Sequence, residues 1–228
     1  MSLKCPYCLL TAAAIAIGLA GCGDSSPPPT ETRPASPAKQ PAKAGISQAT
    51  KDEIGRQGDY LPPLNDRRVE IAVPQDWVPA PRDKKYVVQF IPRVGASYPR
   101  IMVKAKSAAG RAELTSQSAG EFAAEFREEF ARAGDDEEDD DAAAASQPAV
   151  RPLKIGDRYW VETVRKAHAK NVPLERWILA TIVGDQRYTL ELRVYVGRLD
   201  ESRPQALAVA HSLRPAATAT AEPPPAAE

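Results

Sequence analysis

The sequence predicts an α+β domain, with helices packed on a mainly antiparallel sheet and disordered segments at both ends. Three observations predict it. Strand-like runs occur in two groups of three, each group is followed by a helical pattern, and both ends of the chain lack regularly spaced large apolar residues. Of the 228 residues, 43% are hydrophobic, which is enough for one core. We therefore expect a single domain over residues 66–215.

The first group contains three runs in which apolar residues alternate with polar or small ones, the period of a half-buried strand. Their apolar positions are Val69, Ile71 and Val73; Tyr86, Val88 and Phe90; and Ile101, Val103 and Ala105.

A helix is expected next, over about residues 119–133. Ser118 with Glu121 three residues later is a capping-box pattern. Phe122, Phe126 and Phe130 then recur every four residues, which places three rings on one helix face.

The second group consists of residues 159–165, 174–183 and 187–196. The last two runs meet at Gly184-Asp185-Gln186, a strong hairpin signal. A final helix is expected to begin at Asp200 or Ser202, with Pro204 in its first turn. Its inner face carries Leu207, Ala210 and Leu213.

The first 21 residues predict a signal peptide. Lys4 supplies positive charge, residues 9–20 form a short apolar stretch, and Leu19-Ala20-Gly21-Cys22 closes it. This tetrapeptide resembles the lipobox of bacterial lipoproteins, which implies cleavage before Cys22 and attachment of diacylglycerol to its thiol. Two or three acyl chains such as palmitate then anchor the chain stably on the periplasmic side of the cell envelope. A transmembrane anchor needs a longer stretch, and an ordinary secretory signal with a chance cysteine is the alternative.

Three further segments are expected to lie outside the core. Residues 22–65 form a Pro-rich linker and residues 216–228 a tail, both too poor in large apolar residues to pack. Residues 135–148 form a surface loop, in which Asp135–Asp141 is an unbroken acidic run. The run lacks the interleaved turn of a calcium loop, so solvation is the favoured interpretation over cation binding.

Charge is unevenly distributed along a chain whose net charge is zero. Residues 66–215 contain 24 Lys and Arg against 23 Asp and Glu, and seven of those acids form the run. Without it the scaffold carries about plus eight, so the run is able to lie over basic surface and compete with an anionic partner. The zero balance argues against nucleic-acid binding.

No catalytic, cofactor or metal site is expected. His168 and His211 are each interpreted as a solvated or cap-forming side chain rather than a catalytic one, and no catalytic motif surrounds either. Trp77, Trp160 and Trp177 are interpreted as core residues, with a ligand site as the alternative.

The domain resembles the PsbP and Mog1-like domains found in many bacterial lipoproteins. The resemblance lies in the opening Val69–Trp77, in the hairpin that feeds Tyr188-Thr189-Leu190-Glu191-Leu192, and in a closing helix that ends at His211-Ser212-Leu213. It implies a three-layer α/β/α sandwich and a role in binding or assembly.

Two functions therefore stand as hypotheses. The first is a non-enzymatic, membrane-anchored domain that binds an envelope protein or an anionic polymer. The second is an envelope hydrolase with a carboxylate site assembled from residues distant in the sequence. Paired acids facing a cleft favour the hydrolase.

Replacing Cys22 tests the anchor. Cys22→Ala should abolish incorporation of labelled palmitate, because the thiol that accepts the lipid is lost, and should leave uncleaved precursor or soluble product. Cys8→Ala is the matched control, since Cys8 lies inside the expected signal peptide. Equal labelling of the Cys22 variant and the wild type would contradict the lipobox.

Overall fold

The computed structural model describes residues 45–133, 149–169 and 172–217. The expected signal peptide, Cys22, the acidic run and most of the tail lie outside these residues. Within them the chain forms twelve strands and two helices. In order they are β1 (Ser47–Gln48), β2 (Gln57–Tyr60), β3 (Val69–Glu70), β4 (Ala72–Pro74), β5 (Val78–Pro79), β6 (Val88–Ile91), β7 (Arg100–Ser107), α1 (Ser118–Ala133), β8 (Arg151–Ile155), β9 (Arg158–Ala169), β10 (Val172–Val183), β11 (Gln186–Tyr195), α2 (Leu199–Ser212) and β12 (Arg214–Pro215).

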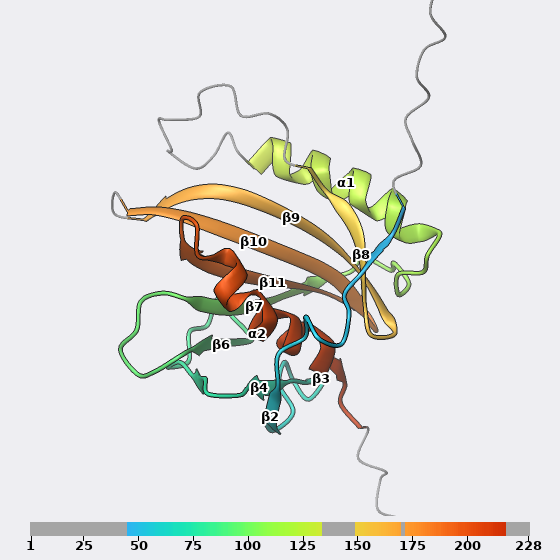
Figure 1. Cartoon of the computed structure of the whole chain (residues 1–228). Coiled ribbons are helices and arrows are strands. Elements are labelled where there is room, and N and C mark those ends of the chain that lie inside the picture. Colours follow the sequence, from blue (N-terminus) through green and yellow to red (C-terminus); the bar gives the residue numbers. More distant parts are fainter. Residues whose placement is uncertain (1–44, 134–148, 170–171, 218–228) are drawn as a thin grey trace, which may run out of the picture. The chain divides into compact units, whose positions relative to one another are not determined.

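Eight of the strands form one sheet, in the order β1-β8-β9-β10-β11-β7-β6-β5. Neighbours run antiparallel except for β1 and β8, which are parallel. The helices α1 and α2 cover opposite faces of this sheet (Figure 1). The expected α+β fold with a mainly antiparallel sheet between two helical layers is confirmed.

The face under α2, called the α2 face, holds the larger core. Alternate residues of each strand point to it, as the two-residue period of a strand requires. Its bulkiest strand side chains are Phe90, Trp160, Trp177 and Tyr188, and α2 packs over the cluster with Leu207 and Ala210.

The opposite face, called the α1 face, holds the smaller core, under α1. There Val161, Ile178 and Ile182 meet Phe122 and Phe126. The rings of Phe122 and Phe126 are 5.9 Å apart, and a further 4.6 Å separates Phe126 from Phe130. The predicted row of three rings on one helix face is therefore confirmed.

The cap of α1 differs from the prediction. The backbone N–H of Ser118 donates to Thr115 Oγ1 at 3.2 Å, and the backbone N–H of Thr115 donates to Ser118 Oγ at 2.9 Å. This reciprocal pair is a capping box in which Thr115 is the cap and Ser118 takes the place usually held by Glu or Gln. The box predicted from Ser118 and Glu121 is wrong by one turn.

The start of α2 also differs. The helix begins at Leu199 after Arg198, which makes no capping bond with its side chain, so neither Asp200 nor Ser202 is the cap. Asp200 lies in the first turn instead, where a carboxylate interacts favourably with the positive end of the helix dipole. Pro204 consequently lies past the first turn, inside the helix.

The folded region begins earlier than the boundary predicted at Asp66. Residues 45–65 were expected to be linker, yet they contain β1 and β2, and Ala49 is buried. The segment packs on the domain through isolated contacts, in which Ile54 and Leu61 lie at the edge of the α2-face core. It has no periodic apolar face. The two-stranded pairing of β12 with β3 likewise holds the chain as far as Pro215.

No helix in the described part of the chain is long and apolar enough to cross a bilayer.

Gly55 provides a test of how firmly this segment is docked. Its N–H donates to the carbonyl of Pro204 at 2.8 Å, and a Cβ added to Gly55 would lie 2.7 Å from that oxygen. Gly55→Ala should therefore force the segment off α2 and lower the free energy of unfolding by about 1–3 kcal/mol, seen as a lower Tm. Gly45→Ala, which meets no atom within 4 Å, is the control. Equal melting of the two variants would show that the segment is not docked.

Candidate functional site: an arginine row on the α1 face

Near the C-terminal end of α1, the α1 face carries a line of four arginines. The strand register places them directly opposite one another across four adjacent strands. They are Arg100 of β7, Arg193 of β11, Arg176 of β10 and Arg165 of β9. Directly opposed residues point to the same face, and adjacent strands are about 4.8 Å apart, so the row spans about 14 Å. We call this set the arginine row.

The arginine row is unfavourable by itself, because like charges opposed on neighbouring strands repel. The repulsion is strengthened where the side chains are shielded from water. The side chain of Arg176 is only 17% exposed and that of Arg193 27%. Such an arrangement requires anions close to the guanidinium groups.

Glu191 supplies one of those anions. Its side chain is 4% exposed, and Oε1 accepts hydrogen bonds from Nε of Arg176 and Nε of Arg193, each at 2.6 Å. Lys104 Nζ lies 3.9 Å from Oε2. Burial alone raises the pKa of this carboxyl, but attraction by the two arginines outweighs it and holds the pKa below its usual range.

The two ends of the arginine row are held by neutral groups. Arg100 Nη1 lies 3.5 Å from Gln89 Oε1, and its buried Nε has no hydrogen-bond partner among the described residues. The guanidinium of Arg165 lies 5.2 Å from the ring centroid of Phe130 in α1. Neither side chain forms an ion pair within residues 45–133, 149–169 and 172–217. Both therefore retain donors for an external anion.

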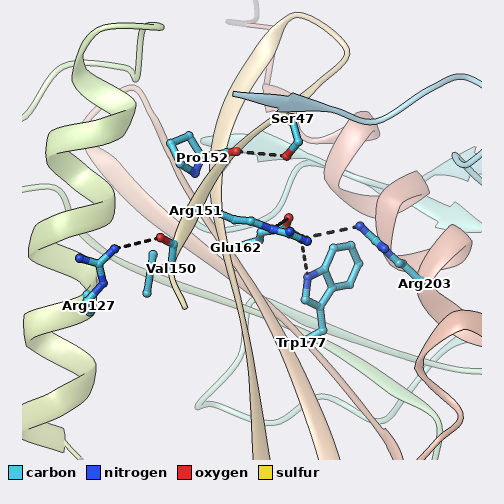
Figure 2. A network of polar contacts seen from close by, with 8 residues as sticks. All are labelled: Ser47, Arg127, Val150, Arg151, Pro152, Glu162, Trp177 and Arg203. Carbon is cyan, nitrogen blue, oxygen red and sulfur yellow. Dashed lines mark hydrogen bonds and ion pairs between the residues drawn. The ribbon is translucent and has the colours of Figure 1, made fainter. Parts of the chain in front are cut away.

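A second buried carboxylate, Glu162, lies on the α2 face (Figure 2). It accepts hydrogen bonds from Arg151 Nε at 2.7 Å and from Trp177 Nε1 at 2.9 Å. Arg203 of α2 approaches to 3.8 Å and stacks over the Trp177 ring. These contacts join β8, β9, β10 and α2, so the network fastens the helix to the sheet.

The positions of these two carboxylates bear on the hydrolase hypothesis. Glu162 pairs with Leu179 of β10, and Glu191 pairs with Ile178, the preceding residue of the same strand. Successive strand residues point to opposite faces, so the sheet separates the two acids. They do not form the close pair that a carboxylate-based hydrolase requires.

The three tryptophans lie where the sequence predicts them. Trp160 and Trp177 are fully buried in the α2-face core, and Trp77 packs half-buried against its edge.

The two histidines are both exposed. His168 lies near the end of β9. His211 lies on α2, where its Nδ1 is 2.8 Å from Gln57 Nε2, a contact that helps to hold β2. His168 follows Arg165 by three residues on β9, so its side chain points to the opposite face of the sheet from the arginine row.

Replacing Glu191 tests its role in the arginine row. Glu191→Gln should lower the free energy of unfolding at pH 7 by about 3 kcal/mol, because two shielded arginines then face a neutral amide. The pKa of Glu191 is lower in the folded state, so its stabilisation is present above about pH 4.3 and declines as the pH falls through the folded-state pKa. The variant should therefore lose less stability than the wild type on acidification, as measured by urea denaturation at several pH values.

The control for this change is Glu201→Gln, which removes an exposed pair with Arg198 and should cost less than about 1 kcal/mol. Equal losses from the two variants would show that Glu191 does not neutralise the arginine row.

Comparison with known proteins gives two solved structures with a distant resemblance to this chain. No protein-family model matches the sequence, and no curated protein does. A Bacteroides thetaiotaomicron structure is 15% identical with a TM-score of 0.46, over 70% of this chain and 49% of that one. The chain thus spans about half the length of that protein. A solution structure of cyanobacterial PsbP (CyanoP) from Synechocystis is 14% identical with a TM-score of 0.42, over 64% of this chain and 86% of that one.

Proposed function

We propose that this chain is a lipid-anchored, non-enzymatic binding domain of the bacterial envelope, which binds an anionic partner on the arginine row. Cys22 provides the anchor and the chain after it the spacer. The arginine row provides the binding site.

The observation that carries the proposal is the alignment of four guanidinium groups on one sheet face. A guanidinium presents a planar fork of donors that matches a carboxylate or a phosphate. Four of them lie within about 14 Å, and Arg100 and Arg165 are held by a neutral amide and a neutral ring. An anionic partner relieves the repulsion between the arginines, so its binding is favoured by more than the new contacts alone.

The placement of the acids supports binding rather than hydrolysis. Glu162 is engaged by Trp177 and two arginines inside the α2-face network. Glu191 is engaged by arginines whose attraction keeps it ionised, so it is unsuited to donate a proton as a general acid.

The binding test uses poly-L-glutamate as the probe and the full mature chain. Replacing both Arg100 and Arg165 by Gln should weaken binding at least about 100-fold, since charge-assisted hydrogen bonds contribute roughly 1.5–3 kcal/mol each. Titration calorimetry at low and high salt measures the change, and the effect should diminish as salt screens the charges.

The matched control is Arg56→Gln with Arg67→Gln, which removes the same charge from exposed positions away from the arginine row. This control should change Kd less than about threefold. Equal weakening in both double variants would show that only net charge matters. The variant with Arg100→Gln and Arg165→Gln should melt at a temperature no lower than the wild type, because it removes like charges that repel.

A further inference from the structure

We infer that the anionic partner is an acidic segment of another protein that also carries apolar or aromatic side chains. The inference rests on the proposed function and names the class of partner. It comes from the residues that border the arginine row on the same face.

An apolar strip lies immediately beyond the arginine row along the strands. Tyr195 follows Arg193 by two residues on β11, so both side chains point to the α1 face. Its residue surface is 48% exposed, and its ring meets the ring of Tyr98 edge-on at 5.5 Å. On β10 the same alternation brings Val172, 37% exposed, to this face. We call Tyr98, Tyr195 and Val172 the apolar strip.

The distances suit an extended polypeptide. Strand residues rise about 3.3 Å each, so Tyr195 lies about 7 Å from its arginine neighbour and Val172 about 13 Å from Arg176. A peptide in extended conformation places alternate side chains about 7 Å apart. It is therefore able to set a carboxylate on the arginine row and an apolar side chain on the apolar strip.

The composition of the combined surface is that of a protein-binding site. Arginine and tyrosine are among the residues most enriched at the energetic centres of protein interfaces. The edge-to-face contact of Tyr98 and Tyr195 orders both rings before binding, which reduces the entropy lost when a partner docks.

The exposures argue against the two other sources of anionic groups. The central arginine side chains, at 17% and 27% exposure, are recessed relative to Tyr195, so the headgroups of a flat bilayer reach them poorly. An anionic polysaccharide reaches the arginines, but its polar surface leaves Val172 without an apolar contact.

The test compares four probes on the full mature chain: poly-L-glutamate, a random copolymer of glutamate and tyrosine, polygalacturonate, and vesicles of phosphatidylglycerol with phosphatidylcholine. The wild type should bind the copolymer about 10-fold more tightly than poly-L-glutamate, matched for length and salt. It should bind polygalacturonate and vesicles less tightly than the copolymer.

Two double variants separate the arginine row from the apolar strip. Tyr195→Ser with Val172→Ser should remove the preference for the copolymer and leave the Kd for poly-L-glutamate within about twofold. Arg100→Gln with Arg165→Gln should weaken the binding of both polypeptides. The control is Tyr60→Ser with Val164→Ser, which replaces exposed residues away from the strip; Val164 pairs with Trp177 and so points to the α2 face. It should retain the preference.

The outcomes distinguish the two proposals. Equal affinity for the two polypeptides, tighter binding of polygalacturonate or vesicles, or an equal effect of the apolar-strip variant and its control would overturn the inference and leave the arginine row as an anion site. Binding of poly-L-glutamate that is unaffected by the arginine-row variant would overturn the proposed function itself.

Discussion

The two-residue turn between β10 and β11 determines what both faces of the sheet present. Gly184 adopts a positive φ of 59°, which primed hairpin turns require at their first central residue and which glycine adopts at little cost. The turn pairs Val183 with Gln186 and thereby sets every later pair of these strands. A slip of one residue would exchange the faces of one strand. Arg193 would then enter the α2-face core, and the arginine row would be lost.

The two faces treat buried charge differently. On the α2 face, Glu162 is contacted by Arg151, Arg203 and the indole of Trp177. These residues belong to the strands and the helix that the network holds together. On the α1 face, Glu191 lies between two guanidinium groups, those of Arg176 and Arg193. Removing a partner from either cluster would leave uncompensated charge in a poorly solvated place. The second cluster differs because the arginines at its two ends contact a neutral amide and a neutral ring.

Sequence reasoning found the elements whose residues are periodic and missed those held by isolated contacts. Phe122, Phe126 and Phe130 form one packed helix face, as their spacing predicts. β8 was not predicted because it is short and contains Pro152, a residue that interrupts most strands. β1 was not predicted because its two polar residues show no hydrophobic periodicity and join the sheet through backbone hydrogen bonds.

The arginine row was missed for a related reason: no two of its members are close in sequence. Half of it could have been derived from the hairpin alone, because Arg176 lies eight residues before Gly184 and Arg193 eight after Asp185. The positions of Arg100 and Arg165 depend on the registers of β7 and β9. The sequence contains no turn signal from which we predicted those registers.

The pairing of β1 with β8 also protects the protein from self-association. Without β1, β8 would present unpaired N–H and C=O groups at the edge of the remaining seven-stranded sheet, and such edges are templates for intermolecular pairing. Ser47 and Gln48 shield part of that edge, and the Ala49 N–H adds a bond to Lys154 O at 2.9 Å. β1, at the start of the domain, therefore also covers part of the edge of the sheet. Proteolysis between β1 and β2 would separate β1 from the domain and open this edge of the sheet to aggregation.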